Sequence, residues 1–409
     1  MILHMLTFIS YLALTLTTGQ AAPIINSSRP RLPVVDLGVT VHRATSNESG
    51  GYYVFSNIPY AEPPVGPLRF AQPVPRATVN RTIDDGTNTR ICPQANPAWI
   101  GISISYVFQV IGARSGQNTS EGNGSIPAPS PYPQLPQSED CLLLDINVPQ
   151  TVFKFGVIDE SKKLPVLVWI HGGGFAVGSK NDVNPAGLMA AGRRDGRAGF
   201  VYVGINYRLL ALTWVNKNIH RFGGNPGAVT VIGESAGGSG IKAQLSAFGG
   251  VQGSTPFRRG IIQSPAMRPA SSAALYAQVY KEFLAAAKLP SISAARALPT
   301  TQIQALNAAI IGNAPFGHYP FGPNVDGQFI PDEPAKLLTR GLVDKSVDLI
   351  VARNSAEGLL FVDPRVQNET GFEAYFQSLM PTVPRTRISQ LATVYPEDFS
   401  GAQPYKDQT

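Results

Sequence analysis

Residues 229–245 read VTVIGESAGGSGIKAQL, and this stretch decides the fold that we expect for the chain. Its first four residues are typical of a buried strand, and its last six favour a helix. Between them, Gly233 and Gly237 flank Ser235 in a G-x-S-x-G pattern. Side chains at the two glycine positions would clash in a sharp turn. Such a turn between strand and helix lifts the serine hydroxyl over the helix N-terminus. We therefore predict that Ser235 is a nucleophile.

A second glycine pattern, WIHGGGF at residues 169–175, follows another expected strand. Successive glycines leave the backbone N–H groups of Gly173 and Gly174 free to point at a ligand. Together with the N–H of Ala236, they would stabilise the oxyanion of a tetrahedral intermediate. A phosphate-binding loop is the alternative, but no Lys-Ser/Thr pair follows the glycines. The pattern predicts an oxyanion hole.

From residue 164 onward, short Val/Ile-rich runs alternate with helical segments. This alternation favours an α/β fold with a mostly parallel central sheet and helices on both faces. Ligands of such sheets bind at the carboxyl ends of the strands. Upstream, residues 33–44 and 51–64 are expected to form antiparallel strands joined by a turn at 46–51.

The composition limits the classes of function. The 409 residues are 43% hydrophobic and 15% charged, which is enough for one large α/β domain or two ordinary ones. Lys and Arg exceed Asp and Glu by 33 to 27, giving a net charge of +6, but the basic residues are scattered. Nucleic acids are therefore not expected partners, because they require a clustered basic face. The oligomeric state is left open.

The N-terminus has the features of a secretory signal peptide. The apolar stretch at residues 5–18 is followed by GQAAP, which fits cleavage near Ala21 or Ala22. We therefore expect a signal peptide at residues 1–21, a secreted mature chain from residue 22, and no membrane span in that chain. An N-terminal membrane anchor is the alternative, although the stretch is short for a span.

Two further features fit an extracellular protein. Cys92 and Cys141 are the only cysteines and can pair in an oxidising compartment. With two cysteines and dispersed histidines, neither a zinc site nor another metal or cofactor is expected. Six N-glycosylation sequons are also present, at Asn26, Asn47, Asn80, Asn118, Asn123 and Asn368.

Residues 93–137 are dominated by Gly, Ser, Pro and Asn, and only WIGISISYVFQVIGA within them is apolar. A loop of this length without its own secondary structure is usually functional or disordered. We favour a lid-like loop with an apolar underside that covers a pocket. A surface excursion with no such role is the alternative.

The chain resembles the type-B carboxylesterase/lipase family, which has the α/β-hydrolase fold shared with the cholinesterases. The resemblance extends over most of the sequence and rests on family-specific stretches. These are NIPYAEPPVGPLRF (57–70), SEDCLLLDINVP (138–149), PVLVWIHGGGFAVGS (165–179), FGGNPGAVTVIGESAGG (222–238), IIQSPA (261–266), PNVDGQFIPDEP (323–334) and NSAEG (354–358).

The resemblance implies a serine hydrolase that cleaves small-molecule or lipid carboxylic esters through an acyl-enzyme. It implies a disulfide between Cys92 and Cys141 around the lid-like loop, and a buried structural ion pair between Arg69 and Glu139. By the same resemblance, the catalytic acid is Glu357, which follows the expected strand VDLIVA.

Asp326 is a competing acid, but it lies in a PNVDG stretch that indicates a turn. We therefore expect Asp326 to be structural.

The base of the expected triad is missing. In the family a histidine follows the acid, but the 409 − 357 = 52 residues after Glu357 contain none. His4 lies in the signal peptide, His42 in an expected strand and His171 in the oxyanion loop. His220 ends the helix before the nucleophile strand, where the helix dipole explains it. His318, in a proline-rich loop upstream of the acid, is the only reserve candidate.

A second departure from the family lies at NYRLLALTW, residues 206–214, where a strand and a helix that are usually separated almost meet at 209/210. We therefore interpret residues 22–409 as an α/β-hydrolase domain that lacks its C-terminal part and an internal segment. A shortened gene model or a splice variant would give this pattern. A chain with this sequence is expected to be poorly soluble, because of an exposed sheet edge, and nearly inactive.

Two other classes stay open: a non-catalytic binding or adhesion protein on the same scaffold, and a signal receptor built on it.

Overall fold

The computed structural model describes residues 32–114, 135–206, 208, 210–250, 255–265, 273–366 and 368–394. These residues belong to one compact unit, which begins at Leu32. The predicted signal peptide, residues 115–134 of the lid-like loop, and the sequons at Asn26, Asn118 and Asn123 lie outside the described residues.

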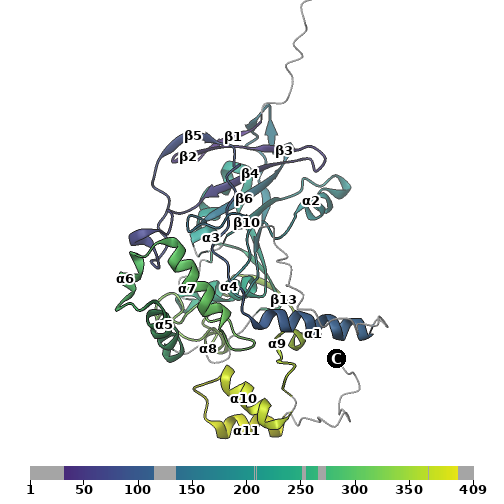
Figure 1. Cartoon of the computed structure of the whole chain (residues 1–409). Helices are drawn as coiled ribbons and strands as arrows, with labels where there is room; N and C mark the ends of the chain where they lie inside the picture. The colour runs from purple at the N-terminus through teal and green to yellow at the C-terminus, as the bar shows by residue number, and fades with distance from the viewer. Residues whose placement is uncertain are drawn as a thin grey trace, which may run out of the picture. The chain divides into compact units, whose positions relative to one another are not determined.

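An eight-stranded mixed sheet forms the centre of the molecule (Figure 1). Its order is β13-β12-β11-β9-β10-β6-β4-β3. The strands from β13 to β10 pair in parallel, and those from β10 to β3 pair antiparallel. The strand bounds are β3 (Thr45–Asn47), β4 (Tyr52–Pro59), β6 (Leu143–Pro149), β9 (Leu164–Ile170), β10 (Val201–Ile205), β11 (Gly224–Glu234), β12 (Arg259–Gln263) and β13 (Asp348–Ala352).

A separate three-stranded sheet has the order β1-β2-β5. Residues 33–44, expected as one strand, form the two strands of a hairpin, β1 (Val34–Asp36) and β2 (Thr40–Arg43). The chain turns at Gly38, where φ is +86°, a value that glycine adopts at little cost. β5 (Asn80–Asp84) then pairs with β2 in parallel. A short hairpin of β7 (Phe153–Lys154) and β8 (Val157–Ile158) completes the strands of the described residues.

Helices connect the strands of the large sheet, and three more helices follow its last strand, β13, in the sequence that the structure describes. Those that concern the site are α1 (Trp99–Arg114), α2 (Ala186–Gly192), α3 (Leu210–Asn218), α4 (Ala236–Leu245) and α9 (Gly358–Phe361). The others are α5 (Ala273–Ala287), α6 (Ile292–Arg296), α7 (Thr300–Gly312), α8 (Pro334–Thr339), α10 (Glu369–Leu379) and α11 (Arg385–Val394). Short 3₁₀ turns include η4 (Ile219–Phe222), which follows α3.

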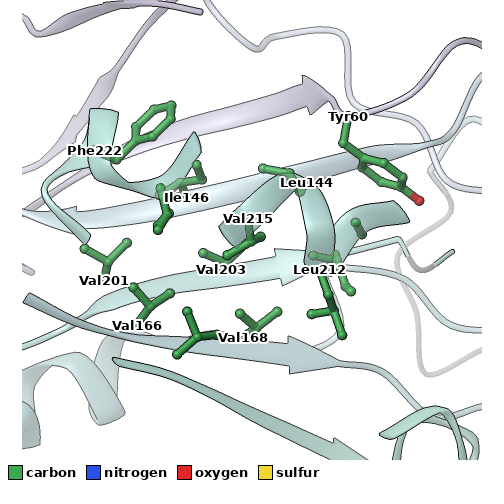
Figure 2. Close-up of a cluster of buried hydrophobic side chains, with 14 of the residues drawn as sticks. Tyr60, Leu144, Ile146, Val166, Val168, Val201, Val203, Leu212, Val215 and Phe222 are labelled. Atoms are coloured by element: carbon green, nitrogen blue, oxygen red, sulfur yellow. The ribbon is translucent and has the colours of Figure 1, made fainter. Parts of the chain in front are cut away.

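Side chains alternate between the two faces of the large sheet along every strand, so each face presents apolar side chains. A helix packs against each of these faces. On one face, valines of β9 and β10 join α3 in the main core (Figure 2). On the other face, Leu167 and Trp169 of β9 pack with Met189 of α2. Helices on both faces and a parallel centre confirm the expected α/β architecture. The first cluster includes Val166, Val168, Val201, Val203, Leu212 and Val215.

β13 is one edge of the large sheet in the described part of the chain, and all five of its residues are exposed. The exposed fractions of Leu349, Ile350 and Val351 are 46%, 62% and 65%. An uncovered apolar strand of this kind favours association between chains. In the described ranges no helix combines the length and the apolar character needed to cross a membrane.

Candidate active site

Ser235 stands in a sharp turn between the last residue of β11 and the first residue of α4, and we call this turn the elbow. Its backbone has φ 52° and ψ −117°, a conformation that residues other than glycine rarely adopt. Two hydrogen bonds hold the elbow: the Ser235 N–H donates to Gln263 O at 2.9 Å, and the Ser239 N–H donates to Ser235 O at 3.0 Å. Ser235 is half-buried at the carboxyl end of a central strand, the end of a parallel sheet at which ligands bind.

The glycines around Ser235 are required by close backbone packing. A Cβ built on Gly233 would lie 2.6 Å from the carbonyl carbon of Gly237. A Cβ built on Gly237 would lie 2.1 Å from Ile170 O, at the end of the neighbouring strand β9. The elbow therefore brings the start of α4 directly against the end of β9. Residues 171–178 follow β9 and carry two of the predicted oxyanion donors, so we call them the oxyanion loop.

The glycine loop after β9 lies beside Ser235. A Cβ on Gly172 would approach Ser235 Cβ to 3.4 Å. Gly173 and Gly174 have φ values of +93° and +61°, and neither N–H donates to a backbone acceptor among the described residues. Ala236 is the first residue of α4, so its N–H has no partner within the helix. The loop that carries Gly173 and Gly174 thus starts beside Ser235, and Ala236 follows Ser235 directly in sequence.

The His171 side chain packs against the backbone of this loop. Its side chain is buried, and its Nδ1 lies 2.9 Å from Gly172 O. A Cβ on Gly178, where φ is +104°, would lie 2.3 Å from the same nitrogen, so the loop closes tightly on the ring. Burial lowers the pKa of His171 to about 4. The imidazole is therefore neutral near pH 7.

Glu357 follows β13 and precedes α9. Its Oε1 accepts hydrogen bonds from Ser264 Oγ at 2.7 Å and from the Asn354 N–H at 2.6 Å. The bond from Ser264, then that from the Asn354 backbone, hold the pKa of Glu357 below its usual value. The carboxylate is therefore oriented and ionised near pH 7.

Sequence reasoning missed three residues of this region: Ser264, Asn354 and Glu234. Ser264 follows β12, the neighbour of β11, so the strand order could have placed it at the same sheet end as Ser235. Asn354 Nδ2 donates to Ser264 Oγ at 3.3 Å and extends the network.

Glu234 precedes the serine, and its Oε2 lies near Gly172, although the residue as a whole is exposed. Burial of the carboxyl group and then the nearby charge of Glu357 raise the pKa of Glu234.

The other histidines lie as follows. His42 is buried in β2 with its Nε2 2.9 Å from Thr40 Oγ1. His220 is exposed in η4, and its carbonyl accepts the N–H of Gly223. His318 lies upstream of α8, and its carbonyl accepts the indole N–H of Trp99 at 3.0 Å. His4 is outside the described residues.

The lid-like segment contains a helix that the sequence did not predict, α1. A disulfide joins Cys92 to Cys141, with S–S at 2.00 Å. Next to the disulfide, Gln94 exchanges two hydrogen bonds with Gly178, which ends the oxyanion loop. Farther along, Ser103 of α1 donates to the carbonyl of Leu360 in α9. This segment therefore contacts both the oxyanion loop and the helix that follows Glu357.

Arg69 and Glu139 form a buried bidentate pair. Arg69 Nε and Nη2 each lie 2.6 Å from a Glu139 carboxylate oxygen, and the side chains of Arg69 and Glu139 are 7% and 9% exposed. Arg69 Nη1 also donates to the carbonyls of Arg296 and Leu298. The pair thus ties the segment before β6 to the α6–α7 region.

Asp326 accepts the N–H groups of Gln328 and Ile330, the pattern of a turn residue. The sequons within the described ranges lie at the β3–β4 turn, on β5 and before α10, at Asn47, Asn80 and Asn368. Among the described residues, no group of three or more His, Cys, Asp or Glu side chains is arranged to hold a metal ion.

The strand order and the elbow define an α/β-hydrolase fold. A solved thermophilic PNB esterase superposes with a TM-score of 0.68 at 24% identity, covering 90% of this chain and 72% of that one. An Aspergillus niger protein, EstA, superposes with a TM-score of 0.67 at 22% identity, covering 90% of this chain and 68% of that one.

Comparison at the level of sequence identifies the family as well as the fold. The carboxylesterase family model matches residues 38–209 and 209–402, and the two matches meet where an internal segment is expected to be missing. Carboxylesterase patB of Aspergillus clavatus is 36% identical over 443 aligned positions, 98% of this chain and 78% of the relative. Para-nitrobenzyl esterase of Bacillus subtilis is 30% identical, over 85% of this chain and 68% of the relative. The chain belongs to the carboxylesterase family, whose chemistry is the hydrolysis of carboxylic esters.

Proposed function

We propose that the chain carries an ester-hydrolase site in which Ser235 attacks the ester carbonyl. The N–H groups of Gly173, Gly174 and Ala236 receive the negative charge that develops on the carbonyl oxygen. The alcohol leaves, and water then hydrolyses the acyl-enzyme. The observation that carries this proposal is the strained turn at Ser235 beside a glycine loop of positive φ. The substrates that we propose are small-molecule or lipid carboxylic esters.

Glu357 is the proposed acid of the site. Residues 358–409 contain no histidine, and His171 is held neutral by its burial in the oxyanion loop. Loss of the base from a serine triad lowers turnover by about 10⁶, while oxyanion stabilisation and binding keep roughly 10³–10⁴ over water. We therefore propose that this sequence retains the acylation site but turns over esters very slowly.

We also propose that the protein is secreted and glycosylated, on the strength of its N-terminal stretch and its sequons. Relatives named secreted lipases, from Gibberella zeae and Botryotinia fuckeliana, are consistent with this proposal. The exposed apolar side chains of β13 support the expectation of poor solubility.

The test combines labelling and turnover. The chain with this sequence, its Ser235→Ala variant and a Ser378→Ala control would be treated with a fluorophosphonate and assayed with p-nitrophenyl butyrate. Ser378 is an exposed serine of α10, so its removal controls for surface labelling. We expect slow covalent capture at Ser235 only, with ester turnover near the limit of detection.

Turnover within tenfold of a full-length relative would show that another group serves as the base. A complete absence of capture would instead favour a non-catalytic binding protein on the same scaffold.

A further inference from the structure

A polar pocket lies between the small sheet and the antiparallel end of the large sheet. Its cavity is about 240 Å³, smaller than the roughly 300–1,000 Å³ of sites for drug-sized ligands. None of the residues proposed for ester hydrolysis lines it. The pocket therefore raises a separate question about what it holds.

The wall formed by the small sheet is polar throughout. Thr40 of β2 pairs with Asn80 of β5, and His42 pairs with Asp84. Because side chains two residues apart point to the same face of a strand, Thr82 lies on this face as well, and all five line the pocket. Thr40 and His42 are buried, whereas the three residues of β5 are exposed, so this polar wall runs from the interior to the protein surface.

Three residues of the lining carry buried polar atoms that have unused hydrogen-bonding capacity. His42 and Asn57 are 1% and 4% exposed. Within the described part of the chain, neither His42 Nδ1 nor Asn57 Oδ1 makes a hydrogen bond, and the same holds for Arg76 Nε. Asp84 Oδ2 lies 3.9 Å from His42 Nδ1. Leaving such atoms unsatisfied costs about 1–3 kcal/mol each, so a polar group that reaches them from the pocket would be stabilised.

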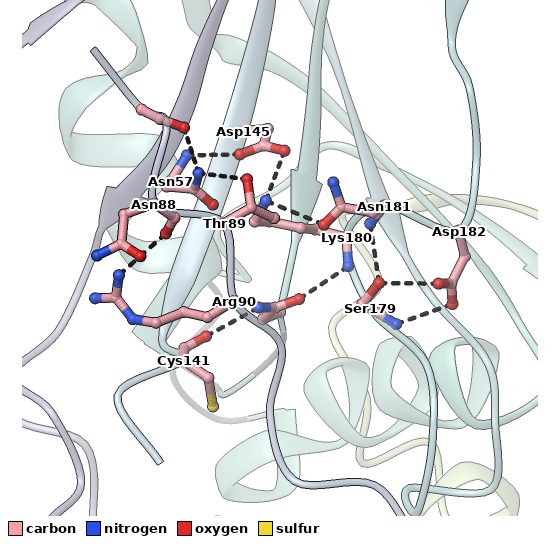
Figure 3. Close-up of polar contacts among 12 residues, drawn as sticks. Asn57, Asn88, Thr89, Arg90, Cys141, Asp145, Ser179, Lys180, Asn181 and Asp182 are labelled. Atoms are coloured by element: carbon pink, nitrogen blue, oxygen red, sulfur yellow. Dashed lines mark hydrogen bonds and ion pairs between the residues drawn. The ribbon is translucent and has the colours of Figure 1, made fainter. Parts of the chain in front are cut away.

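The orientation of Asn57 is fixed by its neighbours (Figure 3). Its Nδ2 donates to Gly86 O at 2.6 Å and to Thr89 Oγ1 at 3.0 Å, and its backbone N–H donates to Asp145 Oδ1 at 2.7 Å. Among the described residues, the amide group keeps one unsatisfied acceptor, Oδ1, and that atom belongs to a residue of the pocket lining.

The charges of the lining indicate a neutral ligand. Two arginines, Arg76 and Arg90, are balanced by two aspartates, Asp84 and Asp140. Arg90 is paired with Asp140 at 2.6 Å, and Arg76 is paired with Glu62 at 2.9 Å. A hydroxyl group both donates and accepts, which suits a lining that offers both kinds of partner.

We infer that this pocket binds a single sugar ring, a neutral polyhydroxyl group, against His42 and Asn57. Two sources could supply it. Asn80, an exposed asparagine on the pocket wall, begins the sequon Asn80-Arg81-Thr82, so the ring can be the first sugar of an N-glycan. The other source is a free carbohydrate. The rim side chains of β5 are exposed, so the pocket is open to either.

The first arm tests the attached sugar. The chain would be secreted from a yeast, occupancy of Asn80 read by peptide mapping, and the glycans trimmed to one N-acetylglucosamine by endoglycosidase H. We expect the trimmed protein to keep the thermal midpoint of the untrimmed one. Asn80→Gln also removes the hydrogen bond from the Thr82 N–H to Asn80 Oδ1, so we expect it to lower the midpoint by about 2 °C more in glycosylated chain than in chain made in bacteria. Thr370→Ala is the matched control, because it removes the Asn368 sequon but keeps the Asn368 side-chain cap of α10. It should leave the midpoint unchanged.

The second arm tests the free sugar on unglycosylated chain made in bacteria. We expect saturation transfer from the protein to millimolar N-acetylglucosamine that falls at least fivefold in Asp84→Ala. Asp85→Ala is the control, since Asp85 is exposed and pairs with Arg43 away from the lining. A positive first arm identifies the glycan as the source, and a positive second arm alone identifies a free carbohydrate. No stabilisation by the Asn80 sugar together with no Asp84-dependent transfer would overturn the inference, whatever the result for ester hydrolysis.

Discussion

Ser264 Oγ donates a hydrogen bond to Glu357 Oε1 across 2.7 Å, although 93 positions separate the two residues in sequence. The strands that precede them, β12 and β13, are parallel neighbours with Gln263 opposite Ala352. Since parallel strands end at the same edge of the sheet, the residues that follow them meet there. The hydrogen bond to the proposed acid thus comes from the residue that follows β12. This strand lies between β13, which precedes the acid, and β11, which precedes Ser235.

Ser264→Ala should raise the pKa of Glu357 toward its ordinary value, because the hydroxyl is the main group that lowers it. A carboxyl with a depressed pKa contributes stability above its unfolded pKa and loses it as pH falls through the folded pKa. The variant should lose this contribution. Carboxyl ¹³C NMR titration measures the shift, with Asp363, held by Arg365, as an unaffected internal reference. An unchanged Glu357 titration would contradict the assignment.

Gly237→Ala should unfold or severely destabilise the elbow, because the new Cβ would lie 2.1 Å from Ile170 O, a backbone atom that cannot move away cheaply. Gly240 is the matched control. It lies in the same helix, and a Cβ added there would meet open space. Gly240→Ala should therefore stabilise the chain by up to about 1 kcal/mol. Urea unfolding of both variants checks the pair, and equal effects would show that the close approach is not limiting.

His171 should make stability depend on pH. Its pKa is about 4 in the folded chain and 6.5 in the unfolded one, so only the unfolded chain binds the proton between these values. Stability is complete above pH 6.5 and declines as the pH falls toward 4. From pH 7 to pH 5 the loss is about 2 kcal/mol. His171→Gln should remove this part of the slope in urea unfolding, whereas His220→Gln, at an exposed site, should keep it.

The strand, turn and helix around Ser235 were predictable because local patterns determine them. The glycines at 233 and 237 leave few other conformations for that turn, and the Val/Ile runs identify the parallel strands. The oxyanion loop follows from the same local logic.

Features that depend on contacts between distant segments were not predictable. Ser264 donates to Glu357 and accepts from Asn354, and only the order of the strands brings Ser264 to these two residues. Helix α1 is not evident in the sequence because Gly, Ser and Pro dominate the segment around it, and apolar residues on most of its surface give no helical period. The hairpin of β1 and β2 was expected as one strand, because Gly38 alone is a weak signal for a turn.

The Arg69–Glu139 pair should show strong coupling. Burial would raise the pKa of Glu139, but hydrogen bonds from Arg69 and Thr300 outweigh burial and lower it. Glu139→Gln leaves the Arg69 charge buried and uncompensated, so we expect a loss of about 3–5 kcal/mol in the free energy of unfolding. Arg69→Met should cost a similar amount.

The double variant Arg69→Met/Glu139→Gln should cost clearly less than the sum of the two, because neither charge is then left alone. The exposed pair Arg43–Asp85, at 3.0 Å, is the control: Asp85→Asn should stay near the wild-type stability. Urea unfolding of the four members of the cycle gives the coupling energy. Strict additivity would mean that the two charges do not compensate each other, and that Arg69 is satisfied by the carbonyls of Arg296 and Leu298 instead.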